Sequence, residues 1–210
     1  MKPLSAFYPR ILPYAPGCSE PFAAQALVSA AIEFCEAAQV LREDLDTFYT
    51  VEDQIQYDLD PPNSQLTFAR IMGVTLDDTV ELKGVMAEEL RNLPQEKAKP
   101  RAFYTDRTGS SFTLRLGPKP DGVYKVVVHA ALRPTREATQ LEDDLYSIWI
   151  DPLVNATLSK ILQVPNQPFT NFMMAEKYAK DAARGFATSR TEGNYGLIRG
   201  SMRVRSRPFA

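Results

Sequence analysis

The chain of 210 residues has one histidine, His129, and two cysteines, Cys18 and Cys35, with which to build nucleophilic or metal-binding chemistry. A Ser-His or Cys-His pair would have to use His129, and so would a mixed Cys/His zinc site. His129 lies in the segment YKVVVHAAL, whose β-branched residues predict a strand. The sequence around it contains neither a nucleophile elbow nor a paired ligand spacing. We therefore interpret His129 as a structural residue of a strand.

The two cysteines occupy different kinds of segment. Cys35 falls on the apolar face of a predicted helix, where a buried cysteine behaves as a small hydrophobic residue. Cys18 precedes a predicted helix start in PGCSE, where a helix dipole could lower its thiol pKa. No basic residue is close to Cys18 in the sequence, so we interpret it as a turn residue.

Three pairs of adjacent carboxylates are the remaining candidates for acid–base chemistry: Asp77–Asp78, Glu88–Glu89 and Asp143–Asp144. Adjacent side chains point in different directions on helices and strands, so none of the pairs forms a ready dyad. Asp77–Asp78 indicates a hairpin turn, and Asp143–Asp144 indicates the first turn of a helix. The common glycine-rich phosphate loops are missing from the sequence. We expect a protein that is not an enzyme, with no catalytic, cofactor-binding or metal-binding residues.

Composition favours a globular protein of ordinary surface charge. Apolar residues make up 44% of the chain and the net charge is −2, which does not indicate a protein that binds polyanions over its whole surface. Prolines interrupt the first 17 residues, so these lack the apolar core of a signal peptide, and no apolar run approaches the ~18 residues of a membrane span. Two cysteines are too few for a disulfide framework. We expect a soluble, unsecreted protein in a reducing compartment.

The hydrophobic periodicity predicts an α+β fold. We expect a helical bundle of one N-terminal and two C-terminal long helices, with a small antiparallel β unit inserted between them. The predicted boundaries are residues 1–46 and 133–192 for the helical body, 47–132 for the β subdomain and 193–210 for an extended basic arm. Residues 1–18 are rich in proline and are expected to be irregular.

The predicted helices carry two features that concern their packing. Ser19 is a candidate N-cap for the first long helix. Leu141–Gln163 is predicted to be one helix in which Pro152 either produces a kink or is the first residue of a new helix capped by Asp151. Thr170–Thr191 is predicted to be the last helix, in which Gly185 is unfavourable by about 1 kcal/mol relative to alanine. Gly185 therefore indicates a close approach to a neighbouring backbone.

Alternation and turn residues predict the strands of the β unit. Thr50–Tyr57 alternates like a half-buried strand, and the two segments on either side of Asp77–Asp78 are expected to form a hairpin. A short helix is predicted at residues 86–92. Three further strands are predicted at residues 102–105, 112–116 and 123–132.

The last residues combine an alternating pattern with a strongly basic character. Residues 199–210 hold four arginines and no acidic residue, and Arg203, Arg205 and Arg207 would share one side of an extended arm. Such an arm can add to a sheet edge or lie in a groove of a partner. The residues that we predict to bind a partner are Arg199, Met202, Arg203, Val204, Arg205, Arg207, Pro208 and Phe209.

Several segments, taken in order, resemble the head-to-tail adaptor proteins of tailed bacteriophages. They are PYAPGCSEPFAAQALVSAAIEFCE near the start, PKPDG before a strand, ALRPTREA before a helix, LSKILQVPNQPF, and the final GNYGLIRGSMRVRSRPFA. The resemblance runs from about Tyr14 to Ala210. Its nearest type is the tail tubular protein A or gatekeeper-like adaptor of short-tailed phages, although Trp149 to Pro152 fit that pattern less well.

This resemblance implies a structural virion protein without catalysis or cofactor. The implied partners are the portal protein, the tail nozzle or tail tube protein, and eleven other copies in a twelve-fold ring, with transient contact to genomic DNA in the lumen and no contact with a membrane. The implied location is the head-tail junction of the virion, and the host cytoplasm before assembly. We expect self-association to be weak in isolation and promoted by the portal.

Two other classes of protein stay open at this point. Four arginines in the tail could contact nucleic-acid phosphates, but no interleaved aromatic residues or recognition helix accompany them. An enzyme or small-ligand protein could use the β unit, for which the sequence shows no convergent polar cluster.

Overall fold

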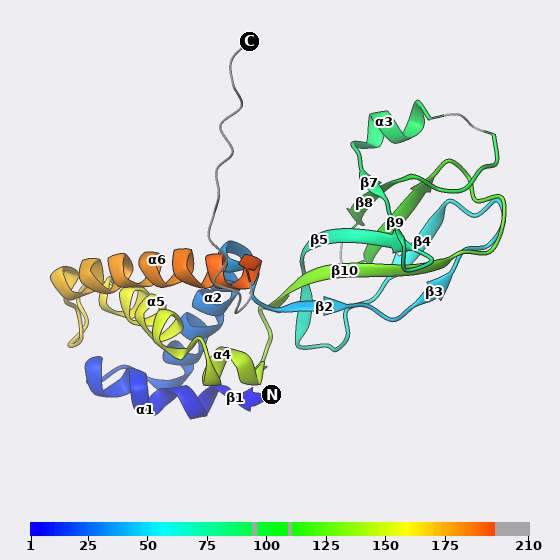
Figure 1. The fold of residues 1–210 in the computed structure, drawn as a ribbon. Coiled ribbons are helices and arrows are strands. Elements are labelled where there is room, and N and C mark those ends of the chain that lie inside the picture. The colour runs from blue at the N-terminus through cyan, green and yellow to red at the C-terminus, as the bar shows by residue number, and fades with distance from the viewer. Residues whose placement is uncertain (94–95, 109–110, 196–210) are drawn as a thin grey trace, which may run out of the picture.

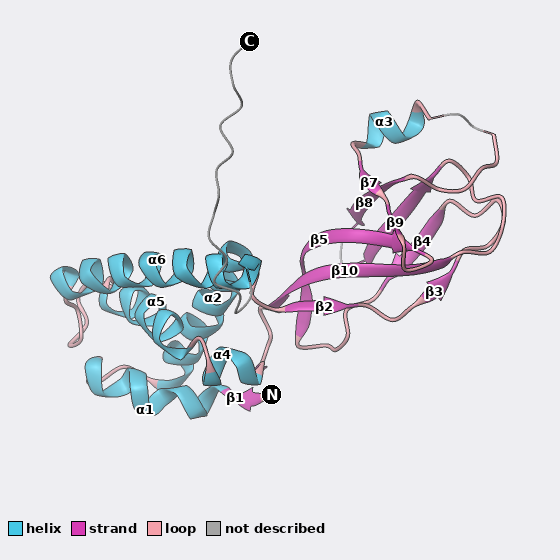
Figure 2. Ribbon diagram, in the orientation of Figure 1, coloured by secondary structure: helices cyan, strands magenta, loops and turns pink. Residues whose placement is uncertain are grey.

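Most helices gather at one end of the molecule, whereas α3 (Ala87–Arg91) lies with the larger sheets at the other end (Figures 1 and 2). The computed structural model describes residues 1–93, 96–108 and 111–195. Three strands reach from the sheets toward the helices, namely β2 (Arg42–Asp44), β5 (Leu66–Leu76) and β10 (Lys125–Pro134). The predicted α+β class is confirmed.

Helix α2 (Glu20–Ala38) is the N-terminal long helix of the prediction. Ser19 is its N-cap in an extended conformation, with no capping hydrogen bond from its side chain, and proline is tolerated in its first turn. One face of α2 is largely alanine and is buried, which lets neighbouring helices approach closely. The helix ends at Gln39, whose left-handed φ of 52° turns the chain toward β2.

The predicted bundle of one N-terminal and two C-terminal long helices is wrong. The segment predicted as a single helix is divided into α4 (Asp143–Ser147) and α5 (Ile150–Leu162), with Trp149 in a non-helical conformation between them. Pro152 is the third residue of α5. A backbone N–H at this position would have no acceptor within the helix, so proline, which lacks the N–H, costs no helical hydrogen bond there. The helix therefore restarts before Pro152 with Trp149 as its N-cap, and Asp151 lies inside the first turn.

Helix α6 (Phe172–Tyr195) is longer than predicted, because it continues through Gly193, which we had assigned to the arm. It packs along α5, and both helices contact α2. Gly185 lies against Pro152: a Cβ added to this glycine would be 2.6 Å from the Pro152 Cβ. The close approach predicted from Gly185 is confirmed. Residues 196–210, which hold the predicted partner-binding arginines, lie outside the described residues.

The first 14 residues are more regular than predicted. They form a short strand, two 3₁₀ turns and one helical turn: β1 (Lys2–Pro3), η1 (Leu4–Phe7), α1 (Tyr8–Ile11) and η2 (Leu12–Tyr14). Proline falls in the first turn of α1 and of η2, where it is compatible with a helical turn. Phe7 and Ile11 are fully buried. The Phe7 ring packs edge to face on the Tyr146 ring, with 5.2 Å between the ring centres. Hydrophobic burial therefore orders this proline-rich segment.

The β unit contains two sheets. The first has the order β2-β10-β5-β6, with β6 at Val80–Glu81, and β3 (Phe48–Tyr49) also pairs with β10. The second has the order β4-β9-β8-β7. Its strands are β4 (Gln56–Leu59), β9 (Ser111–Gly117), β8 (Ala102–Thr108) and β7 (Lys83–Gly84).

The β unit was predicted to be antiparallel, but the pairing of β7 with β8 is parallel, so the unit is not wholly antiparallel. Strand β11 (Gln140–Leu141) pairs with β1, and α3 is Ala87–Arg91.

Most of the predicted strands are present, with one clear error. The hairpin at Asp77–Asp78, the helix near residue 90 and the three later strands are confirmed. Thr50–Tyr57 is wrong, because residues 50–55 form a turn and β4 begins only at Gln56. The alternation of Val51, Asp53, Ile55 and Tyr57 was misleading, because Asp53 has a positive φ of 67° that turns the chain and Val51 is 55% exposed.

The two sheets pack face to face across a core that continues into the helices. Phe68 of β5 packs edge to face on Phe112 of β9, with 4.8 Å between the ring centres. The ring centres of Phe48 and Tyr57 are 5.1 Å apart. One hydrophobic cluster of buried residues includes members of both sheets and of α2, α5 and α6. The division into residues 1–46 with 133–192, and 47–132, stays a prediction.

Candidate partner-binding surfaces

His129 lies on β10 and contacts the neighbouring strands on both sides. Its Nδ1 bonds to Asp44 of β2, and its Nε2 lies 3.3 Å from the Thr75 hydroxyl of β5. Asp44 is the direct cross-strand partner of His129, and Thr75 lies diagonally across from it. The order Thr–His–Asp is that of a nucleophile triad, but regular strand pairing already accounts for every contact in it.

The two cysteines have surroundings that favour the neutral thiol. Cys35 is fully buried in α2, and burial raises the pKa of its thiol. Cys18 lies just before α2, and partial burial raises its thiol pKa as well. The sequence indicated a turn residue, and the Cys18 backbone N–H donates a hydrogen bond of 3.0 Å to the Ala15 carbonyl in the turn before α2. Neither cysteine resembles an activated nucleophile.

The carboxylate pairs are separated in space and have local structural roles. Asp77 and Asp78 both have positive φ angles, 51° and 57°, and form the β5–β6 turn, in which Thr79 donates a hydrogen bond to the Leu76 carbonyl. Asp143, at the start of α4, forms an ion pair of 2.9 Å with the N-terminal ammonium group. In the described part of the chain, no three His, Cys, Asp or Glu side chains are placed to hold a metal ion.

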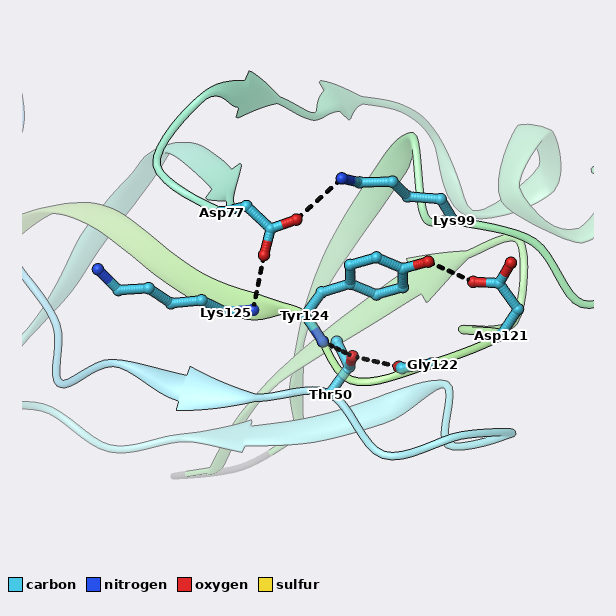
Figure 3. Close-up of polar contacts among 7 residues, drawn as sticks. All are labelled: Thr50, Asp77, Lys99, Asp121, Gly122, Tyr124 and Lys125. Carbon is cyan, nitrogen blue, oxygen red and sulfur yellow. Dashed lines mark hydrogen bonds and ion pairs between the residues drawn. The ribbon is translucent and has the colours of Figure 1, made fainter.

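A polar cluster ties three loops together at the end of the sheets farthest from the helices (Figures 1 and 3). Asp77 accepts hydrogen bonds from the Lys99 ammonium group at 2.8 Å and from the Lys125 backbone N–H at 3.1 Å. The bond from Lys99 holds the pKa of the Asp77 carboxyl below its usual value. The Lys99 ammonium group also lies 4.9 Å from the centre of the Tyr124 ring. Lys99 thereby connects the loop before β8 to two other segments.

The same cluster fixes the loop before β10. The Tyr124 hydroxyl donates to Asp121 at 2.6 Å, and this bond raises the pKa of the phenol. The Thr50 hydroxyl donates to the Gly122 carbonyl and accepts from the Tyr124 N–H, both at 2.8 Å (Figure 3). The donors and acceptors of this cluster are used within the protein, so the cluster can hold loops in place but leaves little capacity for an added ligand.

The loops that this cluster holds carry exposed apolar side chains. Tyr49, Val51 and Val123, which we name the tip patch, are each more than half exposed, and Val123 is 72% exposed. Thr50 binds to both neighbours of Val123, so Val51 and Val123 belong to loops that are tied together. Rigid presentation of apolar groups lowers the entropy lost on binding and is typical of a protein-binding surface.

The opposite end of the molecule has a second apolar surface. Tyr14, Phe172 and Met173, which we name the helical-end patch, are exposed, Met173 to 81%. They lie at the end of η2 and the start of α6, away from the sheets (Figure 1). A shallow groove of about 230 Å³ beside them is lined by Tyr14, Pro16, Phe169, Met174 and Tyr178, among other residues. Exposed apolar side chains therefore occur at both ends of the protein, in the tip patch and in the helical-end patch.

A family comparison identifies the class of this protein. The model of the family described as "SU10 adaptor protein" matches residues 11–207, which is nearly the whole chain. The chain therefore belongs to the SU10 adaptor protein family, and this membership supports the resemblance to phage head-to-tail adaptors found in the sequence. A search of the curated proteins gave no match. Within the described residues, no helix is both long enough and apolar enough to cross a membrane.

The structure adds surfaces that sequence reasoning did not find. Neither the tip patch nor the helical-end patch was predicted: Val51 was assigned to a strand, and Phe172 only to the predicted helix Thr170–Thr191. Proline and glycine around residues 118–122 correctly indicated a turn there, but not which loops it would meet.

Proposed function

We propose that the protein is a structural virion protein that forms a ring beneath the portal and provides the platform for tail or nozzle attachment. The observation that carries the proposal is the match of 197 residues, 11–207, to the SU10 adaptor family. A twelve-fold ring of the gatekeeper-like type found in short-tailed phages is the arrangement implied by the sequence resemblance. The protein acts by binding and not by catalysis.

The shape of the protomer supports a role between two partners. The helical-end patch and the tip patch lie at opposite ends of the molecule, with a continuous hydrophobic core between them (Figure 1). A rigid body with two separated contact surfaces transmits position from one partner to the next. One end would contact the portal side and the other the tail side.

Negative-stain microscopy and native mass spectrometry of the purified protein, alone and mixed with portal, test this function. We expect monomers or small oligomers in the free protein and a ring of copies on the portal. A free ring would contradict weak self-association but retain the adaptor function. A protein that stays monomeric beside portal, with no particle showing added density, would overturn the proposal.

We also propose that residues 199–210 form an arm that docks on the portal. Deleting Gly200–Ala210 should leave the circular dichroism spectrum and melting temperature unchanged, since α6 already ends at Tyr195. The deletion should abolish co-sedimentation with portal-containing heads. A full-length variant with Arg203, Arg205 and Arg207 changed to Gln separates the contribution of charge from that of the backbone. If the truncated protein sediments with heads as the full chain does, the arm is not the docking element.

A further inference from the structure

Strand β2 leaves one of its two edges without a partner strand. It is the end strand of the order β2-β10-β5-β6, and in the described part of the chain no strand pairs with its outer edge. The Leu45 N–H donates to the Val128 carbonyl of β10 at 2.9 Å. Because the backbone groups of successive strand residues point to opposite edges, the N–H and C=O of Asp44 point away from β10. An open edge of this kind is a template for another extended segment.

The open edge of β2 is strongly acidic. Three of the four residues from Glu43 to Asp46 are acidic, and all three are exposed. The Asp44 side chain remains 67% exposed although it contacts His129. Glu43 and Asp46 form no ion pair among the described residues. A second copy of β2 placed against this edge would bring acids close to acids, which is unfavourable. The edge therefore disfavours pairing between copies and favours a basic segment.

The end of α6 brings the remaining chain to this edge. Gly193 lies against the turn between α2 and β2: a Cβ added there would be 3.7 Å from the Ala38 carbonyl oxygen and 3.7 Å from Arg42 Nη2. Residues 196–210 follow, and when extended they span up to about 50 Å, whereas residues 42–46 cover only about 15 Å. A short flexible tether gives an effective concentration in the millimolar range. The basic arm is thus attached within easy reach of the acidic edge.

We propose that in the free protein the basic arm lies along the open edge of β2 of the same chain. Arg203, Arg205 and Arg207 recur at every second residue, and Asp44 and Asp46 have the same spacing, about 7 Å along a strand. The open backbone groups of Asp44 give hydrogen bonds to the arm, and the guanidinium groups bind the carboxylates beside them. The arm enters at the Arg42 end of β2 and therefore runs parallel to it. Only the later step, in which the portal displaces the arm from β2, rests on the proposed function.

Hydrogen exchange of single backbone amides, followed by NMR in the free full-length protein, tests this contact. The Asp44 N–H is the probe, because it points to the open edge. The Leu45 N–H is the internal control, because it is bonded to Val128 and responds only if β2 itself separates from β10. The full chain is compared with a chain that lacks Gly200–Ala210, and with two full-length variants. The first variant carries Arg203→Gln, Arg205→Gln and Arg207→Gln, and the second carries Glu43→Gln and Asp46→Asn.

We expect the Asp44 N–H to exchange about tenfold faster in the truncated chain and in both variants, as after the loss of one hydrogen bond. The Leu45 N–H should exchange at the same rate throughout. High salt should accelerate exchange at Asp44 in the full chain, since it screens exposed charges. The matched control is Asp58→Asn with Asp60→Asn, which removes two exposed carboxylates at and after β4 and should leave the probe unchanged.

Equal exchange at Asp44 in the full and truncated chains would overturn the proposal. An acceleration in the Asp58→Asn, Asp60→Asn control equal to that in the Glu43→Gln, Asp46→Asn variant would overturn it too, because general charge would then be the cause. Protection that falls when the protein is diluted would show that the arm belongs to another copy, which contradicts binding within one chain. The sample contains no portal, so each outcome is independent of whether the protein acts as an adaptor.

Discussion

Replacing Gly185 by alanine should destabilise the helical end of the molecule, although alanine is the better helix former. The added Cβ would lie 2.6 Å from the Cβ of Pro152, 3.4 Å from its Cα and 3.5 Å from its Cγ. Ordinary contacts of this kind begin at 3.4 Å, so α5 and α6 would have to separate by close to 1 Å. The contacted atoms belong to a proline ring and its backbone, which cannot rotate away.

The size of the effect follows from two opposing contributions. Alanine in place of glycine within a helix gains about 1 kcal/mol, whereas overpacking a tightly packed site costs about 1–3 kcal/mol. We choose the upper part of this cost because the obstructing ring is rigid, which gives a net loss of about 1–2 kcal/mol. For a chain of this length, that loss lowers the melting temperature by about 2–8 °C.

The assay is urea unfolding followed by circular dichroism, with Gly193→Ala as the matched control on the same helix. A Cβ at Gly193 would meet its nearest neighbour at 3.7 Å, an ordinary contact, so this variant should be neutral or slightly more stable. If Gly185→Ala proves as stable as Gly193→Ala, the close contact between α5 and α6 does not exist in solution and the packing argument is refuted.

Three further predictions concern individual side chains. The folded-state pKa of Asp77 is lowered by Lys99, so its stabilising effect is present above the unfolded pKa of about 3.9 and is lost as the pH falls through the folded value. Asp77→Asn, which tolerates the positive φ, should therefore reduce the loss of stability between pH 7 and pH 3; parallel pH profiles would contradict this. His129→Ala should fold and support infection in a phage complementation assay, and a folded variant that fails would restore the case for catalysis. Cys35→Ala should lose about 1 kcal/mol of unfolding free energy by chemical denaturation, whereas Cys18→Ser should change it by less than about 0.5 kcal/mol.

Local sequence determined the features whose cause lies within a few residues. Ser19 and the alanine-rich face specified the start and packing side of α2, and Asp77–Asp78 specified a turn that requires left-handed backbone. Gly185 in a helix implied a close neighbour, because a glycine there is unfavourable without one. The ordered segments indicated a phage head-to-tail adaptor, and the match of residues 11–207 to the SU10 adaptor protein family supports that class.

The tertiary structure alone decided the features that depend on distant partners. The division between α4 and α5, and the helical turns of the proline-rich first 14 residues, follow from burial of side chains such as Phe7 against Tyr146. Alternation along β9 placed Arg115 opposite to Leu114, but only strand pairing brought Gln56 and Tyr104 beside it. Periodicity shows which side of an element is polar. Which side chains meet there depends on strand order and register, and these are set by the packing of the whole core.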